Sequence, residues 1–544
     1  MNSVVSGESG RVGDYIEGRL SGVEYYLVEV DPTLDGVEYV SDEVAVEVEA
    51  VLPGGPIGKI IERLDLRLDR ILRSSEFTND DILEGVRTGA FVRFTREEML
   101  ASISREHAGI GMTGGGDCAG IADCLSSMCK NLDPEKSMLG IRNAGRGLSV
   151  APDQFDNQLV LLDPLLAGHI EGQSSTPLGS ARVNALKTSP ENTMTNIDGY
   201  DFFYGTGGDD HLGLLENISE ANPEMTVVGT FKSIDGDGSI NDVPAQMLGF
   251  KTAVGVYRSA ISAALQNADT HDQITVVELF GRKSGKLAFE SARRHPSDLG
   301  TFSREEKRKI EDFGDSTVIL VPEKPASLLS VAREVKRVRE ERGNCVIVAA
   351  EGFMPPELHD LIVELSVNEE VKNLLDGDGV FVNSISYYLA VWAADDISRL
   401  ALLTLFENDH ELARVFVRTV LHTTLDDFGN SVKLAGIRKF IISAISHLTE
   451  YEKVNEMLLN YEARGATPSE YDQVMGRKIG KKMAEVVNDE LAGGRAVVYF
   501  EGMDAMLEDP RVVPLKGVGD KNTLKNADLY SDDMLRENGV FWEV

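Results

Sequence analysis

Short apolar runs end in glycine-rich polar loops from about residue 107 onward, and most of these loops lead into segments with apolar residues at helical spacing. The runs AGIGMT, DFFYG, TVVG, ITVVEL, TVILV and CVIVAA repeat this arrangement along the chain. Strands that alternate with helices in this way build βαβ units around a parallel sheet. The pattern therefore predicts an α/β fold with ligand-binding loops at the carboxyl ends of its strands.

Two regions depart from this alternation. In residues 1–100, the segments GVEYYLVEVDP and VEYVSDEVAVEVEAVLP predict strands, whereas IGKIIERLDLRLDRIL has the spacing of a helix. From about 355 to 450, segments such as DISRLALLTLF and ELARVFVRTVLHTTL predict a mainly helical insertion. The first region shows no catalytic constellation, so we expect it to serve packing, assembly or regulation. The second shows no glycine-rich ligand loop.

Composition and charge restrict the partners. The chain has 544 residues, of which 42% are hydrophobic and 26% charged, as in globular proteins of more than one domain. Its 89 acidic residues against 54 lysines and arginines give a formal net charge of -35. A surface this negative repels nucleic acid and anionic membranes, so we exclude both as partners. An anionic substrate then needs a local cluster of cations.

The cysteines and the N-terminus indicate a cytoplasmic protein. The four cysteines lack the C-x-x-C spacing of a zinc site, and a chain of this length does not depend on disulfides. Residues 1–18 show no basic segment followed by an apolar core, and we find no apolar segment long enough to span a bilayer. We therefore expect reduced thiols and a cytoplasmic location.

The segment MTVVGTFKSIDGDGSI carries the richest candidate chemistry. Its apolar run ends at Gly229 and is expected to open into a loop that holds hydroxyls, a lysine and two carboxylates. Asp235 could take a proton from an attacking hydroxyl, and Lys232 could neutralise phosphate charge. A solvated turn fits the same residues, because Gly-Asp-Gly and Ser-Ile-Asp are also common in turns.

Three further loops could bind an anion or a metal. The turn at residues 114–117, GGGD, would present backbone N–H groups to a phosphate at a helix N-terminus, although a tight turn without a ligand fits as well. In YGTGGDD we expect a loop over residues 205–210, whose carboxylates suit Mg²⁺ or a helix N-cap. In LFGRKSGK the cations Arg282, Lys283 and Lys286 suit a phosphorylated substrate or a solvated basic turn.

In order and spacing, these loops resemble the phosphofructokinase family over residues from about 107 to 490. The resemblance is carried by GGGDCAG, LGSAR, GTGGDD, FKSIDGD, ELFGRKSG, VPE, AAEG and YEARGATPS. It implies an α/β fold with two Rossmann-like three-layer α/β/α subdomains, an N-terminal extension and a helical insertion.

The resemblance also implies the domain boundaries and the assembly. Residues 1–104 would be the extension, 105–250 the phosphoryl-donor subdomain completed by part of 465–544, and 251–354 the sugar-phosphate subdomain. Residues 355–450 would be the insertion, and 451–544 the return segment with C-terminal helices. A homodimer or higher homo-oligomer is expected, because active sites of the family are completed or supported by a neighbouring subunit.

Two positions of the family pattern point to pyrophosphate as phosphoryl donor. ATP-using members typically carry glycine where this chain has Asp210, and the aspartate would crowd the α-phosphate of a nucleotide. They also typically carry glycine in place of Lys232, which in pyrophosphate-using members contacts the transferring group. The resemblance is to the long pyrophosphate-using type, which phosphorylates fructose 6-phosphate at its 1-hydroxyl reversibly.

The family pattern assigns roles residue by residue. Asp235 would be the general base and Lys232 would stabilise the transferring phosphoryl group. The expected pyrophosphate-binding residues are Gly115, Gly116, Arg182, Gly208, Asp210 and Lys232. The expected sugar-phosphate-binding residues are Ser233, Asp235, Phe280, Gly281, Arg282, Glu351, Tyr461 and Arg464. The expected Mg²⁺-binding residues are Asp209 and Asp237.

Departures from the pattern leave alternatives open. Two arginines that reach the 6-phosphate from a neighbouring subunit in short members align with Gln273 and Asn455, and Arg438 or Lys439 could replace them. Another phosphosugar, such as sedoheptulose 7-phosphate, therefore stays open as acceptor. Lys251, at a position that is acidic in the family, adds a further departure. The alternative functions are an ATP-dependent 6-phosphofructokinase and a non-catalytic regulatory subunit of the same fold.

Overall fold

The computed structural model describes four strands within residues 25–95 and most of residues 103–543. The gaps in the second range are 163–166, 168–169, 175, 241–242, 294–313, 368–392, 395, 410–411, 413–415, 417–435, 490, 503–508 and 517–529. The chain divides into two compact units. Unit 1 comprises Met1–Ser233, Val243–Thr252 and Arg464–Asn522, and unit 2 comprises Ile234–Asp242, Ala253–Ala463 and Thr523–Val544.

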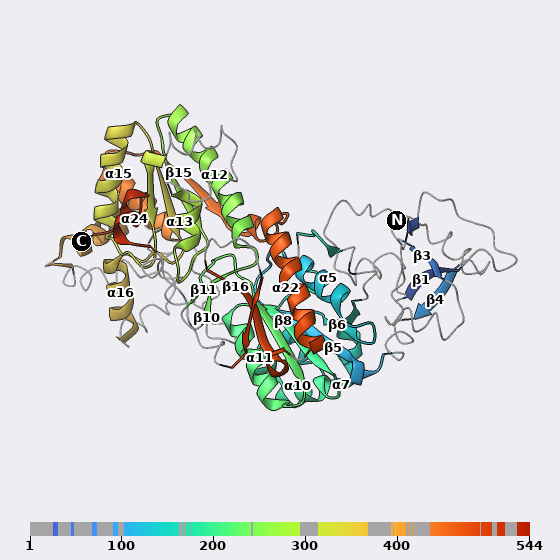
Figure 1. The fold of residues 1–544 in the computed structure, drawn as a ribbon. Helices are drawn as coiled ribbons and strands as arrows, with labels where there is room; N and C mark the ends of the chain where they lie inside the picture. The colour runs from blue at the N-terminus through green and yellow to red at the C-terminus, as the bar shows by residue number, and fades with distance from the viewer. Residues whose placement is uncertain are drawn as a thin grey trace, which may run out of the picture. The chain divides into compact units, whose positions relative to one another are not determined.

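The N-terminal strands form a small antiparallel sheet in the order β2-β3-β1-β4 (Figure 1). Their bounds are Tyr25–Val30 for β1, Ala45–Glu47 for β2, Leu68–Leu72 for β3 and Phe91–Thr95 for β4. The helix predicted over IGKIIERLDLRLDRIL is wrong at β3, and its remaining residues lie outside the described ones. Residues Leu68–Leu72 pair antiparallel with β1 and β2, and these cross-strand contacts outweigh the local helical spacing.

A mostly parallel sheet forms the centre of unit 1. Five strands pair in parallel in the order β16-β9-β8-β5-β6, and β11, β17 and β7 add antiparallel pairs at the ends. Their bounds are β5 Ala108–Thr113, β6 Ser137–Ile141, β7 Leu159–Leu161, β8 Phe202–Gly207, β9 Thr226–Phe231, β11 Val243–Gln246, β16 Arg495–Glu501 and β17 Arg511–Pro514. The parallel strands are almost entirely buried, as their continuous apolar runs predict.

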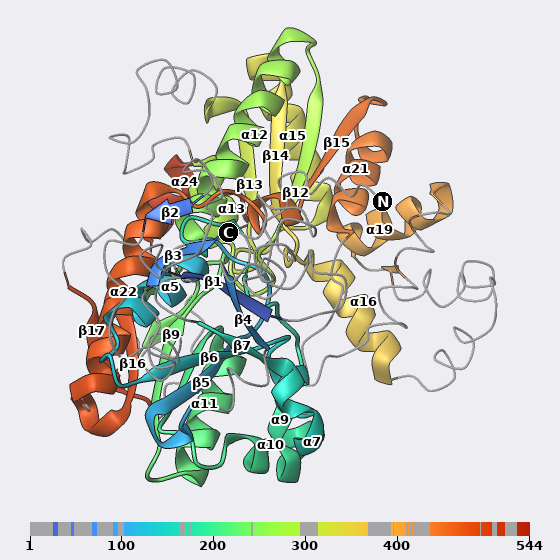
Figure 2. The ribbon, with the colours of Figure 1, turned by 90° about the vertical axis from the view of Figure 1, so that its right-hand side faces the viewer.

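Helices on both sides of this sheet complete unit 1. Helix α11 (Asp209–Ala221) packs on β8 and β9, while α22 (Glu470–Asp489) packs on β9 and β16 and along α5 (Ile121–Asn131) (Figure 2). Two glycines of α22 allow the close approach to α5. A Cβ at Gly476 would lie 2.4 Å from the carbonyl oxygen of Gly120, and one at Gly480 would lie 2.1 Å from that of Cys124.

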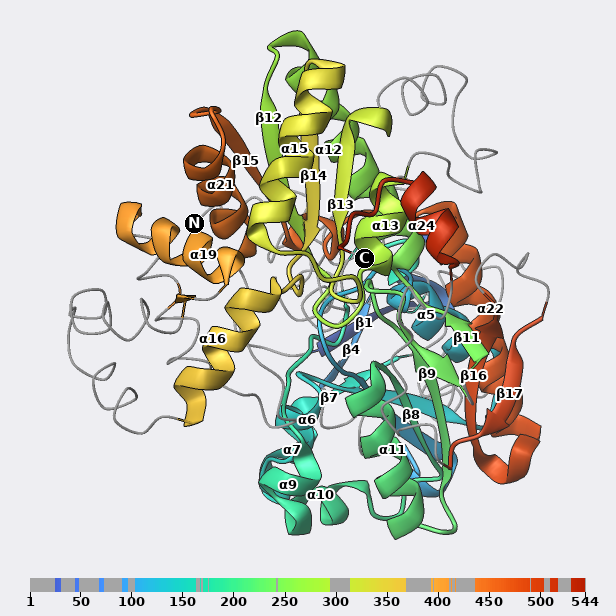
Figure 3. The ribbon, with the colours of Figure 1, turned by 90° about the vertical axis from the view of Figure 1, so that its left-hand side faces the viewer.

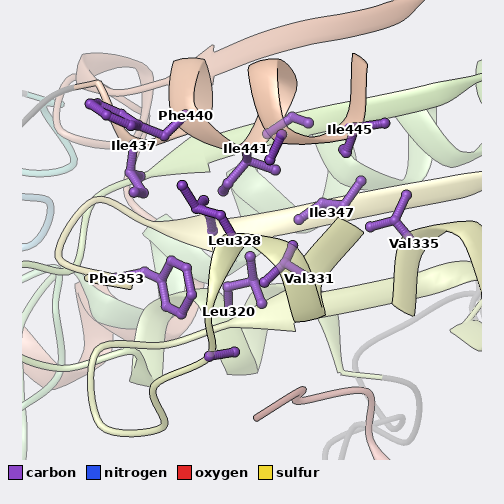
Figure 4. Packing of buried hydrophobic residues seen from close by; sticks show 14 of the residues in the cluster. Leu320, Leu328, Val331, Val335, Ile347, Phe353, Ile437, Phe440, Ile441 and Ile445 are labelled. Carbon is purple, nitrogen blue, oxygen red and sulfur yellow. The ribbon is translucent and has the colours of Figure 1, made fainter. Parts of the chain in front are cut away.

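Unit 2 contains a second, fully parallel sheet in the order β13-β14-β12-β15. The strand bounds are β12 Ile274–Leu279, β13 Thr317–Leu320, β14 Cys345–Ala350 and β15 Val454–Leu459. Helices α15 (Leu328–Arg342) and α21 (Ile437–Leu448) lie side by side along it (Figure 3). Their apolar residues point toward strand residues such as Leu320 and Ile347 and form the core (Figure 4).

The remaining helices of unit 2 agree with the sequence pattern. Two helices, α12 (Phe250–Thr270) and α13 (Lys286–Ala292), follow the predicted glycine-rich loops. The first three residues of α12 belong to unit 1 and the rest to unit 2. In the predicted insertion, the described residues include the helices α16 (Pro356–Val367) and α19 (Ile397–Asn408) as well as α21. The alternation of strands and helices is thereby confirmed for the described part of the chain after residue 103, whereas the exact domain boundaries stay a prediction.

Candidate active site

The glycine turn of unit 1 connects β5 to α5, as its sequence predicts. Asp117 fixes the end of this turn, because its Oδ1 accepts hydrogen bonds from the backbone N–H of Cys118 (3.1 Å) and of Thr176 (2.7 Å). Thr113 donates its hydroxyl hydrogen to the carbonyl oxygen of Gly179 at 2.8 Å. The turn is thus tied to the segment that leads to Arg182, a predicted pyrophosphate ligand, whose side chain is exposed.

Lys232 is buried against this turn. Its side chain is only 4% exposed, and its Nζ donates to the carbonyl oxygen of Gly116. A Cβ at Gly115 would lie 3.2 Å from the same Nζ, so the glycine leaves room for the ammonium. Burial lowers the pKa of Lys232 to about 8, and the nearby cations Arg464 and Arg182 also lower it. The residue is still a cation at neutral pH.

Arg464 also lies against Gly116. A Cβ at Gly116 would lie 1.5 Å from Nη1 of Arg464, so the guanidinium occupies the space that a side chain would need. The family pattern places Arg464 among the sugar-phosphate ligands, whereas the structure brings it to the glycine turn of unit 1. Lys232, Arg464 and Arg182 together give this turn the local positive charge that an anionic substrate requires.

The segment GTGGDD differs from the predicted loop. Strand β8 continues through Gly207, and α11 begins at Asp209 with Gly208 as its N-cap. Neither aspartate is therefore the cap residue, and both stand in the first helical turn, where acidic side chains are favoured. Asp210 is half-buried, and a Cβ at Gly208 would meet no atom within 4 Å. The backbone at Gly208 is open to a ligand, while the side chain of Asp209 lies outside the described residues.

His211 is a residue of this region that the sequence analysis did not identify. Its ring lies beneath the glycine turn, since a Cβ at Gly114 would be 2.4 Å from its Nδ1 and one at Gly207 would be 2.5 Å from its Cγ. Burial lowers the pKa of His211 to about 3, so the imidazole is neutral at physiological pH. It supports the turn without adding charge next to Lys232.

The strand before Lys232 is longer than predicted. Strand β9 runs to Phe231, so Thr230 belongs to the sheet and not to the loop; its buried hydroxyl donates to the carbonyl oxygen of Val498 at 2.7 Å. The polar loop begins after Phe231 and is half-buried at Ser233, Asp235 and Asp237. Lys232 and Ser233 belong to unit 1, and the two aspartates belong to unit 2.

In unit 2, the ends of neighbouring parallel strands bring predicted sugar-phosphate ligands together. Gly281 follows β12 with a φ of 138°, and its carbonyl oxygen accepts the N–H of Gly352 at 3.0 Å. The N–H of Glu351, which follows β14, donates to the carbonyl oxygen of Leu279 at 2.9 Å. Arg282 and Glu351, both half-buried, therefore belong to adjoining turns at one edge of the sheet.

Tyr461 follows the next strand, β15, at the same edge. Its ring packs edge-on against Phe280, with 5.7 Å between ring centroids and 81° between ring planes. Tyr461 is 74% exposed, so one side of its ring and its hydroxyl remain accessible. Phe280, Gly281, Arg282, Glu351 and Tyr461 thus gather at the carboxyl ends of β12, β14 and β15, where ligands bind in α/β sheets.

The basic residues considered as substitutes for the missing arginines are ion-paired. Arg438 Nε lies 3.1 Å from a carboxylate oxygen of Glu456, and Lys439 Nζ lies 2.8 Å from the other oxygen of the same carboxylate. Asn455 donates a hydrogen bond from its Nδ2 to Oε1 of Gln273. The positive charge of Arg438 and Lys439 is therefore partly neutralised in this structure.

Comparison with known proteins agrees with this arrangement. The sequence model described as phosphofructokinase matches residues 109–487. The chain belongs to the phosphofructokinase family. Among its relatives, the pyrophosphate–fructose 6-phosphate 1-phosphotransferase of Amycolatopsis methanolica is 26% identical over 401 residues, which cover 72% of this chain and 90% of the relative. The ATP-dependent 6-phosphofructokinase 2 of Clostridium perfringens is 24% identical, with 75% and 93% covered.

The fold is also that of the family. The pyrophosphate-dependent phosphofructokinase structure from Nitrosospira multiformis superimposes with a TM-score of 0.53 at 14% identity, covering 80% of this chain and 89% of that one. The predicted α/β fold of the family is thereby confirmed. Family membership identifies the chain as a phosphotransferase with an alcohol group as acceptor. None of the helices in the described residues has the length and apolar character needed to cross a membrane.

Proposed function

We propose that the chain transfers a phosphoryl group from pyrophosphate to the 1-hydroxyl of fructose 6-phosphate, giving fructose 1,6-bisphosphate and phosphate. The observation that carries this proposal is the buried ammonium of Lys232 against Gly115 and Gly116. A buried cation beside a glycine turn that leads into a helix suits a compact anion with high charge density. Arg464 and Arg182 add charge to the same turn.

The loop after Lys232 supplies the acceptor chemistry. Asp235 takes the proton of the sugar hydroxyl as its oxygen forms a bond to one phosphorus of pyrophosphate. The bond from that phosphorus to the bridging oxygen breaks, and inorganic phosphate leaves. Lys232 stabilises the charge on the transferring group, because phosphoryl transfer depends mainly on positioning and electrostatics. Pyrophosphate and the sugar bisphosphate are comparable donors, so the reaction runs in both directions.

Each substrate would use the residues that its unit provides. Gly115, Gly116, Arg182, Gly208, Asp210 and Lys232 would bind pyrophosphate. In unit 2, Phe280, Gly281, Arg282, Glu351 and Tyr461 would bind the sugar phosphate, with the loop residues Ser233 and Asp235. Arg464, which the family pattern assigns to the sugar phosphate, would bind phosphate at the glycine turn, because its guanidinium lies against Gly116.

Mg²⁺ suits the carboxylate chemistry of the residues proposed to hold it. No group of three or more histidine, cysteine or acidic residues that could hold a metal occurs among the described residues. Mg²⁺ usually binds through one or two carboxylates together with substrate phosphates, so such a group is not needed. Asp209 and Asp237 would hold the ion, which supplies neutralisation of the phosphate charge. A cytoplasmic location and a homo-oligomeric state remain part of the proposal.

Donor choice is the point at which the relatives divide, since their names include both pyrophosphate and ATP. Asp210 supports pyrophosphate, because its half-buried carboxylate in the first turn of α11 adds bulk and negative charge where glycine would leave space. The alternative is an ATP-dependent 6-phosphofructokinase. A regulatory subunit without activity is less consistent with a site that retains Lys232, Asp235 and Arg282 together.

The deciding experiment measures initial rates with fructose 6-phosphate and Mg²⁺, using pyrophosphate or ATP as donor, for the wild type and Asp210→Gly. The proposal expects activity with pyrophosphate alone in the wild type and a gain of ATP use in the variant. Faster turnover of the wild type with ATP would overturn the donor assignment. Absence of activity with both donors would mean that fructose 6-phosphate is not the acceptor or that the chain is not catalytic. A screen of other phosphosugars, including sedoheptulose 7-phosphate, would distinguish these two explanations.

A further inference from the structure

Lys286 is a buried lysine that the proposed reaction does not use. It is the first residue of α13, its side chain is 4% exposed, and its Nζ donates to the carbonyl oxygen of Gly236 at 2.7 Å. The sequence analysis expected this cation on a basic turn, facing a phosphorylated substrate or solvent. The structure instead directs it to a backbone carbonyl 50 residues earlier in the chain. Burial of an ammonium is costly, so this bond stabilises a specific arrangement.

The acceptor lies in the catalytic loop. Gly236 is covalently flanked by Asp235 and Asp237, and its φ of 66° lies in the left-handed region that glycine adopts without strain. Because neighbouring Cα atoms are about 3.8 Å apart, fixing the Gly236 carbonyl restricts the direction of both adjacent carboxylates. The loop is therefore fixed at its centre by a hydrogen bond from α13.

Lys286 itself is placed by a firm anchor. The N–H of Gly285 donates to both carboxylate oxygens of Glu323, at 3.0 Å each, and the N–H of Lys286 donates to Oγ of Ser284 at 3.3 Å. Helix α13 also packs on β13 and β14. All of these residues belong to unit 2, as do Asp235 and Asp237. Glu323 thus fixes the start of α13, and Lys286 at that start binds the loop.

We propose that Lys286 is a positioning residue that holds the loop of Asp235 in its reactive geometry. The inference rests on the proposed function, in which Asp235 is the general base. Lys286 touches the backbone of the loop and is not required to touch a substrate. A loop released from this bond would leave substrate binding largely intact but would lose the alignment of the base with the acceptor hydroxyl, and misplacement by about 1 Å can lower a rate about 100-fold.

The test compares Lys286→Met and Lys286→Gln with the wild type, using whichever phosphoryl donor the wild type accepts. Lys286→Met keeps the length of the side chain and removes the donor, so kcat should fall about 10- to 100-fold while KM for both substrates changes less than about 3-fold. Lys286→Gln retains an N–H donor and should recover part of the lost kcat. Lys324→Met is the matched control, because this lysine bonds Asp532 at 2.6 Å in the same unit.

Three results would overturn the proposal. The first is an unchanged kcat in Lys286→Met. The second is a rise of both KM values that accounts for the whole loss, which would show a binding role. The third is equal loss in Lys286→Gln and Lys286→Met with equally lowered thermal stability, which would show a general structural role. If Lys286→Met does not fold, kcat and KM of Lys286→Gln test the proposal instead: a lower kcat with unchanged KM supports it, and an unchanged kcat refutes it. An inactive wild type would instead refute the proposed function, which keeps the two failures distinguishable.

Discussion

The guanidinium of Arg464 fills the space beside Gly116 that a larger residue would need, because a Cβ at position 116 would lie 1.5 Å from Nη1 of the arginine. Gly116→Ala should therefore displace the guanidinium from the glycine turn. We expect kcat/KM for the phosphoryl donor to fall at least about 10-fold, since a charge-assisted contact contributes about 1.5–3 kcal/mol. Steady-state kinetics with varied donor concentration measure this loss.

Gly255→Ala supplies the control for that substitution. A Cβ at Gly255, in α12, would meet no atom within 4 Å, and alanine is favoured over glycine in a helix by about 1 kcal/mol. This variant should keep wild-type kinetics and equal or higher thermal stability. If Gly116→Ala has the same kinetics as Gly255→Ala, the position of Arg464 at the turn does not contribute to kcat/KM for the phosphoryl donor.

The lowered pKa of Lys232 predicts a limit of activity on the alkaline side. Burial moves this pKa from the usual 10.5 to about 8, so the ammonium is lost as the pH rises through 8. With pyrophosphate as donor, kcat/KM should decline by about tenfold per pH unit above that value. A profile that stays flat to pH 10 would contradict this assignment, and Lys232→Arg, which stays charged, should not show the decline.

The same residue should reduce stability in exchange for its function. Because the folded-state pKa lies below the unfolded value, the folded protein carries the full cost of the buried charge below pH 8, and this cost disappears as the pH rises toward 10.5. Lys232→Met should therefore raise the free energy of unfolding by about 1–3 kcal/mol at pH 7, with a smaller gain at pH 10. Thermal or urea unfolding at both pH values tests this, and a loss of stability at pH 7 would refute it.

The sequence predicted the elements that local pattern determines. Buried parallel strands such as CVIVAA and ITVVEL are continuous apolar runs, and the glycine turns mark their carboxyl ends. Strand ends were less predictable. We predicted that Thr230 and Gly207 lie in loops, but their backbones continue the hydrogen-bond ladder of the sheet. Only the neighbouring strand, distant in the sequence, decides this.

The supporting roles of Lys286 and Asp472 escaped the sequence analysis for a related reason. Lys286 meets a carbonyl 50 residues away, and Asp472 meets Thr252 across 220 residues. A lysine or an aspartate in a polar segment is usually solvated, so no local signal marks it as buried. The loop proposed to be catalytic stood out in the sequence because its carboxylates, hydroxyl and lysine lie within six residues, from Lys232 to Asp237.

Asp472 should be essential for the stability of unit 1. Its carboxylate accepts hydrogen bonds from the N–H groups of Gly249 (3.0 Å) and Thr252 (2.8 Å) and from the hydroxyls of Thr252 (2.5 Å) and Ser469 (3.3 Å). An asparagine would turn its N–H₂ toward some of these donors. Asp472→Asn should therefore lower the free energy of unfolding by about 1–3 kcal/mol, as measured by chemical denaturation.

Asp123 provides a buried carboxylate for comparison. Burial raises the pKa of Asp123 to about 6, and its ion-pair partner Arg477 has its Nη1 3.3 Å away on a partly exposed side chain. Since the folded-state pKa lies above the unfolded one, ionisation of Asp123 destabilises the folded protein above pH 6. Asp123→Asn removes this cost, so it should not lower the free energy of unfolding at pH 7. Equal losses in both variants would mean that Asp472 has no special role.

Tyr461 should contribute to substrate binding far more than to folding. The ring is 74% exposed and rests edge-on against Phe280, so its removal uncovers little apolar surface. Tyr461→Ala should raise KM for fructose 6-phosphate about 10-fold, change KM for pyrophosphate by less than about 2-fold, and lower the free energy of unfolding by less than about 1 kcal/mol. Leu458→Ala, at another exposed position of the same strand region, is the control and should leave both KM values unchanged. An unchanged KM for the sugar phosphate in Tyr461→Ala would show that Tyr461 does not bind the acceptor. A role in folding would not explain that result, because the ring is largely exposed.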